Sequence, residues 1–266
     1  MARIFYVYGI VAARPAATGA PAGLDDSPVL VRRVGDVAAL VSELDGDEYE
    51  PSSIEVQSGD VDWVASRAVA HDRVLTWASD RGAVIPLPMF TSMFRSAKSV
   101  DEMLRTKGRS LRSLLERIGR GREYALRVYR VDAELKAALP TLDPELKSLT
   151  AAAQAASPGQ RYLLERKLDE RIKDGLRATS QRIAGEIRDQ LSPLAVETTL
   201  SPIPRVAADA PGIMVLNAAF LIAPDRLRAF QERLTEIVSD RQPSGFRFDF
   251  TGPWPPYHFA PSDTDE

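Results

Sequence analysis

The spacing of apolar residues along the chain predicts an alternation of strands and helices. Residues 4–11 are apolar at nearly every position, which is typical of a strand buried on both faces of a sheet. Residues 61–81 carry apolar side chains at three- and four-residue spacing, which predicts an amphipathic helix. Two short β-like runs, residues 29–34 and 37–41, lie between them and predict a hairpin.

The rest of the first half mixes extended and helical patterns. Two prolines in residues 83–90, AVIPLPMF, place that segment at a sheet edge or in a loop. Ser99, with Glu102 three residues later, predicts a capping box and a helix that ends near Gly119. The acidic stretch of residues 43–50 predicts a solvated loop, because its carboxylates lack the spacing of a calcium-binding loop.

The second half predicts a strand, helices, two strands, a helix and a final strand. The predicted segments are residues 123–131, 132–156 (interrupted near Pro140 and Pro144), 160–191, 196–201, 213–222, 224–240 and the run that carries Phe246, Phe248 and Phe250 on one face. This order is that of a split βαβ, ferredoxin-like domain with a helical insertion. We therefore expect an α+β protein with an N-terminal domain over 1–120, a ferredoxin-like domain over 121–251 and a tail over 252–266.

Composition narrows the possible chemistry. The 266 residues include no cysteine, which excludes thiolate nucleophiles, disulfides and zinc–thiolate sites. No run approaches the about 20 apolar residues of a membrane helix. The β-branched and aromatic residues of the N-terminal run fit a buried strand better than a signal peptide, so we expect a cytoplasmic protein.

The sequence predicts no catalytic, cofactor or metal site. Its only two histidines, His71 and His258, have no second histidine at ligand spacing. His71 lies on the apolar stripe of its helix and is expected to be buried and hydrogen-bonded, whereas His258 is expected to be a contact residue of the tail. The chain has no Gly-x-Ser-x-Gly motif, no Walker A motif and no complete dinucleotide fingerprint.

Positive charge is concentrated in one stretch of the chain. Residues 105–130 carry nine basic residues against Glu116 and Glu123. Binding of nucleic acid is one interpretation, and a solvated helix face, an interdomain seam or pairing with acidic protein segments is another. The net charge of −3, and tyrosines that fall outside the basic helix, make nucleic acid the weaker interpretation.

Two proline–aromatic segments, residues 84–94 and the octapeptide GPWPPYHF of residues 252–259, are the most unusual features. Proline restricts the unfolded chain, so such segments form rigid contact surfaces at low entropic cost. We expect Trp254 and Tyr257 to fold back against their own chain. The candidate partner or interdomain contacts are Pro86, Phe90, Arg105, Arg109, Arg112, Trp254, Tyr257 and Phe259.

The octapeptide resembles the C-terminal signature of the gas vesicle GvpL/GvpF family. Three further stretches resemble that family in the same order: IFYVYGIV near the N-terminus, residues 70–90, and SPGQRYLLERK at residues 157–167. Met89-Phe90-Thr91-Ser92 departs from the pattern, because many members have Arg-Phe-Gly-Thr there.

The resemblance implies a non-enzymatic accessory role in gas vesicle formation, without a cofactor. It implies association with the small hydrophobic shell protein and other accessory proteins, a location in the cytoplasm and the gas vesicle, and no membrane partner. The residues themselves leave two other hypotheses open, namely a nucleic-acid-binding module that uses residues 105–130 and a small-molecule-sensing ferredoxin-like regulator.

Overall fold

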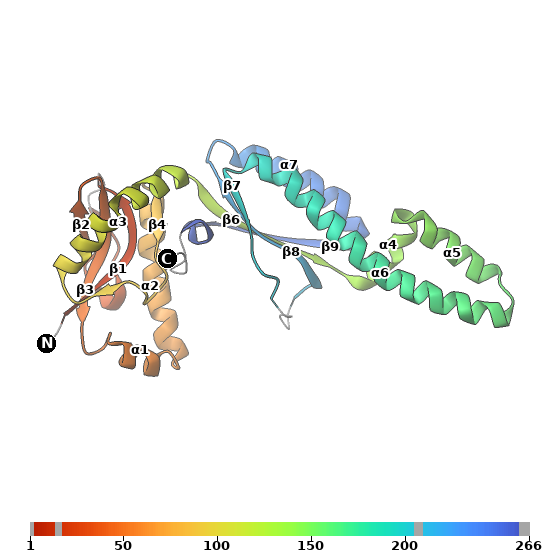
Figure 1. The fold of residues 1–266 in the computed structure, drawn as a ribbon, viewed down its shortest axis with the longest axis horizontal. Helices are drawn as coiled ribbons and strands as arrows, with labels where there is room; N and C mark the ends of the chain where they lie inside the picture. Colours follow the sequence, from red (N-terminus) through yellow and green to blue (C-terminus); the bar gives the residue numbers. More distant parts are fainter. Residues whose placement is uncertain (1–2, 14–17, 205–209, 261–266) are drawn as a thin grey trace. The chain divides into compact units, whose positions relative to one another are not determined.

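The chain forms two compact units, seen in a computed structural model that describes residues 3–13, 18–204 and 210–260 (Figure 1). The first unit comprises residues 1–123 and 253–266, and the second comprises residues 124–252. The chain therefore leaves the first unit once and returns to it with its last residues. Residues 261–266 of the predicted tail lie outside the described residues.

The first unit is built on a five-stranded sheet in the order β2-β3-β1-β4, with β5 also paired to β1. Its strands are β1 (Arg3–Ala12), β2 (Leu30–Val34), β3 (Val37–Asp45), β4 (Val84–Pro86) and β5 (Met93–Phe94). Its helices are α1 (Pro51–Gln57), α2 (Val61–Ser79) and α3 (Ala97–Ile118), with short 3-10 turns at Leu24–Asp26 and Tyr257–Phe259.

The central strand β1 is buried on both faces, as its continuous apolar run predicts. Tyr6 and Tyr8 pack in a core that includes Val74 and Leu75 of α2. Val7 and Ile10 belong to a second core on the opposite face, formed with α3. The register of β1 against β3 shifts between Val7 and Gly9, so the alternation of faces is interrupted there. The first unit thus has a sheet between two helical layers.

Gly9 explains how closely β4 and α2 approach the central strand. A Cβ atom at this position would lie 2.7 Å from the carbonyl oxygen of Ile85 and 2.8 Å from Cδ2 of Leu75. Only glycine fits such a gap without moving the backbone of β4. The strand β4 is an edge strand, which confirms the prediction made from its prolines.

Two predictions for the first unit were wrong in detail, and one helix was not predicted. The N-cap of α3 is Ser96, whose Oγ accepts from the amide of Ser99 at 3.1 Å, so Ser99 lies inside the helix. The acidic stretch is not a simple loop, because β3 continues to Asp45. Helix α1 was missed, since none of its residues is buried and its pattern is mostly polar.

The second unit contains a four-stranded sheet in the order β7-β8-β6-β9. Its strands are β6 (Arg122–Arg130), β7 (Glu197–Leu200), β8 (Ile213–Ile222) and β9 (Phe246–Trp254). The first two residues of β6 and the last two residues of β9 belong to the first unit. Its helices are α4 (Asp132–Leu142), α5 (Pro144–Ala155), α6 (Pro158–Leu191) and α7 (Leu227–Arg241), with 3-10 turns at Ser192–Leu194 and Gln242–Ser244.

One core joins the sheet of the second unit to its helices. Phe246, Phe248 and Phe250 pack into it as the sequence predicts, and Phe250 stacks on Tyr124 with ring centroids 5.3 Å apart. The two sheets and their helices make this a mixed α+β fold.

Some boundaries in the second unit differ from those predicted. Helix α4 continues through Pro140 and breaks only at Asp143, whose carboxylate accepts from the amides of Glu145 and Leu146 and starts α5. Helix α7 begins at Leu227 rather than Pro224. Strand β9 extends past Thr251 as far as Trp254.

Candidate functional site

The C-terminal octapeptide packs on the first unit. Pro255, Pro256 and Phe259 are buried, and Phe259 retains 2% of its accessible surface. The guanidinium of Arg117, near the end of α3, donates to the carbonyl oxygen of Phe259 at 3.1 Å. The tail is therefore anchored at its far end by both an apolar and a polar contact.

The carboxylate of Glu123 holds the tail at a second point. It accepts from the backbone amide of His258 at 2.9 Å and contacts Nδ1 of the same residue at 2.6 Å. The Glu123 side chain is buried, with 4% exposed, so these contacts satisfy a charge that would be costly alone. His258 is thus a contact residue, as predicted.

The other two tail aromatics remain partly exposed. Tyr257 lies beside Asp72 of α2, and burial raises the pKa values of both the phenol and the carboxyl group. Tyr257 nevertheless keeps 37% of its surface exposed and Trp254 keeps 44%. These two side chains are the aromatic part of the tail that remains accessible at the surface.

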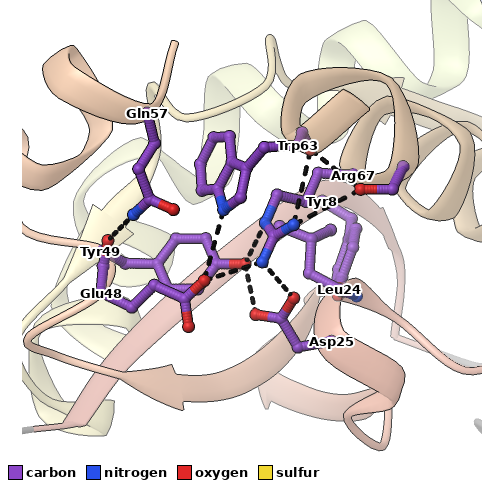
Figure 2. Close-up of polar contacts among 9 residues, drawn as sticks. Tyr8, Leu24, Asp25, Glu48, Tyr49, Gln57, Trp63 and Arg67 are labelled. Atoms are coloured by element: carbon purple, nitrogen blue, oxygen red, sulfur yellow. Dashed lines mark hydrogen bonds and ion pairs between the residues drawn. The ribbon is translucent and has the colours of Figure 1, made fainter. Parts of the chain in front are cut away.

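A polar and aromatic cluster surrounds Arg67 of α2 (Figure 2). We call Asp25, Glu48, Tyr49, Trp63, Arg67 and Phe90 the Arg67 cluster. The guanidinium donates to Asp25 at 2.6 Å, to Glu48 at 2.7 Å and to the hydroxyl of Tyr49 at 3.0 Å. Its carbon Cζ lies 4.1 Å from the ring centroid of Trp63, a cation–π distance.

Tyr49 forms hydrogen bonds to both Asp25 and Arg67 of this cluster. Its hydroxyl donates to Asp25 at 2.5 Å while it accepts from Arg67. Burial, together with the carboxylate of Asp25, raises the pKa of Tyr49, so the phenol stays protonated and remains a donor. The cluster joins the turn before β2, the connection after β3 and helix α2.

Phe90 completes the Arg67 cluster with a strained backbone. Its ring stacks on Trp63 with centroids 5.3 Å apart, and its φ is +65°, in the left-handed region. Pro86, the other candidate in this segment, is buried at the end of β4 opposite Gly9. Both residues shape the fold of the first unit, and Phe90 is half-buried.

His71 is buried and hydrogen-bonded, as its place on the apolar stripe predicts. Nε2 contacts the carbonyl oxygen of Leu87 at 3.1 Å and Nδ1 contacts the hydroxyl of Tyr6 at 2.6 Å. Since a carbonyl can only accept, Nε2 carries the proton and Nδ1 accepts from Tyr6. Burial lowers the pKa of His71 to about 4, so the ring is neutral at physiological pH.

Most of the basic stretch of residues 105–130 is used inside the fold. Internal polar partners are present for Arg112 (Asp36 and Glu116), Arg117 (Phe259), Arg122 (Ser79 and Asp80), Arg127 (Asp249) and Arg130 (Asp132). Arg105, Arg109 and Arg112 line a groove between α3 and the β2–β3 turn. This arrangement gives little support to a continuous nucleic-acid-binding face.

The eight predicted contact residues all belong to the first unit, but they do not form one site. Three lie in the tail, two at the β4–β5 segment and three along α3. The Arg67 cluster was missed except for Phe90. Two signals pointed to it: Tyr49 is an aromatic residue within an acidic stretch, and Trp63 and Arg67 lie four residues apart on one helix.

In the ranges 3–13, 18–204 and 210–260, no three histidine, aspartate or glutamate side chains gather in a way that could hold a metal ion. Over the same ranges, no helix combines the length and the apolar character needed to cross a membrane.

The family model described as "Gas vesicle synthesis protein GvpL/GvpF" matches residues 4–261. The chain therefore belongs to the GvpL/GvpF family of gas vesicle proteins. It is 28% identical to gas vesicle protein L of a Streptomyces species, over 97% of this chain and 93% of the relative. It is 27% identical to gas vesicle protein L1 of Halobacterium salinarum, over 96% of this chain and 90% of the relative.

Two solved structures share the fold. The crystal structure of gas vesicle protein GvpF from an Anabaena species matches with a TM-score of 0.73 and 23% identity, over 98% of this chain and 99% of that one. The crystal structure of GvpF from Microcystis aeruginosa matches with a TM-score of 0.66 and 22% identity, over 97% and 99% of the two chains.

Proposed function

We propose that this chain acts without catalysis in the assembly or organisation of gas vesicles. It would bind the hydrophobic shell protein, together with other accessory proteins, or become a minor component of the shell. The observation that carries this proposal is the family match over residues 4–261, which takes in nearly the whole chain. The proposed location is the cytoplasm and the gas vesicle.

The physical basis is the behaviour of apolar subunits before they assemble. A protein that polymerises through apolar surfaces aggregates unless those surfaces are covered until the correct partner arrives. A protein with a rigid, partly exposed aromatic surface can provide such cover temporarily. Trp254 and Tyr257 offer this surface, because Phe259 and the buried prolines hold the segment in place.

We also propose that the second domain is ferredoxin-like, with α4 and α5 as the helical insertion. The strand order β7-β8-β6-β9 supports this, since the second, third, first and fourth strands of the domain lie side by side in that sequence. The division into 1–120, 121–251 and 252–266 remains our proposal for the domains. The chain divides into its two compact units between residues 123 and 124, close to the first of these boundaries.

Deletion and co-purification test the function together. We expect cells that lack this chain to form few or no gas vesicles, and we expect the tagged chain to recover the shell protein from cells that make vesicles. Normal vesicles after the deletion, together with no recovery of the shell protein, would contradict the proposal.

The proposed surface needs a matched variant. Replacing both Trp254 and Tyr257 with alanine should reduce recovery of the shell protein about tenfold, because aromatic side chains carry much of the binding energy in protein interfaces. Val56→Ala is the control, since Val56 is an apolar side chain of the first unit that is 80% exposed. Equal losses in both proteins would show that the tail is not the contact surface.

A further inference from the structure

A groove on the first unit runs between helix α3 and the β2–β3 turn. It is lined by Asp36 of the turn and by Arg105, Gly108, Arg109 and Arg112 of the helix. Leu104 and Val37 close its floor, since they are 0% and 2% exposed. The three arginines follow one another at four- and three-residue spacing and therefore lie along one face of the helix.

The charges around this groove leave it positive. Arg112 is paired with Asp36 of the turn and with Glu116 of its own helix. Asp101, near Arg105, accepts hydrogen bonds from Nε and Nη2 of Arg32, at 2.9 and 2.6 Å. Among the described residues, Arg105 and Arg109 have no carboxylate partner within 4.0 Å.

Gly108 lies between these two arginines in the interior of α3, where glycine lowers helix stability relative to alanine. No atom lies within 4 Å of the position that a Cβ would take there, and its φ is not positive. Neither internal packing nor backbone geometry therefore requires glycine. A residue without a side chain at this point instead leaves room for another backbone to approach the helix.

We infer that this groove, here called the α3 groove, binds an extended acidic segment of a partner protein. Carboxylates of the segment pair with Arg105 and Arg109, and its backbone passes over Gly108. The inference rests on the proposed function only in taking the partner to be another gas vesicle protein.

The lining of the groove favours a peptide over a nucleic acid. None of the residues that line it is aromatic, so bases would find no stacking surface. The carboxylate of Asp36 would repel a continuous phosphate backbone, whereas a peptide can place its charges away from that point.

Binding of a defined probe to the full-length chain tests the inference. The probe is a fluorescently labelled peptide of alternating glutamate and serine, measured by anisotropy, beside the same peptide with glutamine in place of glutamate. We expect the acidic peptide alone to bind. The double variant Arg105→Gln/Arg109→Gln should weaken that binding at least about tenfold, because charge-assisted contacts are lost.

The matched control is Arg73→Gln/Arg120→Gln. Both residues are exposed in the first unit but do not line the groove, and the change in net charge is the same. The control should bind the acidic peptide as the unchanged protein does. Equal weakening in the two double variants, or no binding of the acidic peptide, would overturn the inference.

Gly108→Ala is a second test, in which stability and peptide binding should change in opposite directions. The variant should raise the melting temperature, because alanine favours the helix, and yet weaken binding of the acidic peptide. Gly185→Ala in α6 is the control, since a Cβ there also meets no atom within 4 Å. It should raise the melting temperature and leave binding unchanged, and unchanged binding in Gly108→Ala would contradict the close approach.

Binding of a single-stranded DNA oligonucleotide tests the alternative that the groove binds nucleic acid instead of an acidic peptide. Tighter binding of the oligonucleotide than of the peptide, with steep salt dependence and loss in Arg105→Gln/Arg109→Gln, would overturn the inference in favour of nucleic acid. Because the assay contains no shell protein, it can fail while co-purification with the shell protein succeeds, and the reverse also holds.

Discussion

Both carboxylate oxygens of Glu123 contact His258: Oε2 accepts from the backbone amide at 2.9 Å, and Oε1 lies 2.6 Å from Nδ1. The two residues are separated by more than half of the chain, yet both belong to the first unit. The contact fixes the tail at the point where β6 begins.

Glu123→Gln should destabilise the first unit by about 2 kcal/mol, because the amide group of glutamine cannot accept both hydrogen bonds and leaves a buried polar group unsatisfied. Chemical denaturation measures the change. Glu55→Gln on the exposed face of α1 is the control and should alter stability by less than about 0.5 kcal/mol. Similar values for the two variants would mean that the contact adds nothing.

Loss of the buried Phe259 side chain should lower the free energy of unfolding more than Glu123→Gln does. Phe259→Ala removes a side chain that is 2% exposed, and such truncations in a core cost about 3–5 kcal/mol. Removal of every residue after Thr251 should lower the melting temperature at least as much. An unchanged melting curve after this truncation would make the tail a free partner-binding arm.

Arg67→Lys should weaken the Arg67 cluster while keeping the charge. Lysine cannot bridge Asp25, Glu48 and Tyr49 at once and stacks less well on Trp63, so we expect a loss of about 2 kcal/mol. Arg81→Lys is a close control, because Arg81 also stacks on a tryptophan of α2, Trp77, but forms no ion pair with any carboxylate among the described residues. A loss in Arg81→Lys as large as in Arg67→Lys would assign the effect to stacking alone.

Stability should fall as the pH is lowered from about 6.5 to 4. The folded state holds His71 with a pKa near 4, below the value of 6.5 for the unfolded chain. The unfolded state therefore binds more protons in this window, and protonation favours unfolding by up to about 3 kcal/mol at the acid end. Urea denaturation at a series of pH values measures this.

His71→Gln isolates the contribution of the imidazole, since glutamine does not titrate. The variant is expected to be less stable at pH 7 and to show a shallower decline between pH 6.5 and 4 than the unchanged protein. Asp72 is present in both proteins, so the effect of its raised pKa cancels in the difference. Parallel pH profiles would refute the assignment to His71.

The elements whose position depends on local pattern could be predicted from the sequence. The apolar run of residues 4–11 required cover on both faces of its strand, and the alternation of Phe246, Phe248 and Phe250 required one buried face. The apolar stripe of α2 likewise predicted that His71 is buried.

The Arg67 cluster could not be predicted in this way. Its carboxylates, Asp25 and Glu48, come from segments far from Arg67 in the sequence, and only the folded sheet brings them together. An acidic stretch has the same composition whether water or a guanidinium neutralises it. The start of α3 was predicted at the wrong serine, because Ser96 and Ser99 are both suitable N-cap residues. Only the hydrogen bond from the Ser99 amide to the Ser96 hydroxyl shows that Ser96 is the cap.

The return of residues 253–266 to the first unit has a consequence for synthesis on the ribosome. Domains generally fold as units while the chain emerges from its N-terminus. Here the first unit receives Phe259 only after the whole second unit has been translated. A nascent chain that has not yet reached Phe259 therefore lacks the finished first unit, so the first unit is completed only after the second has been translated.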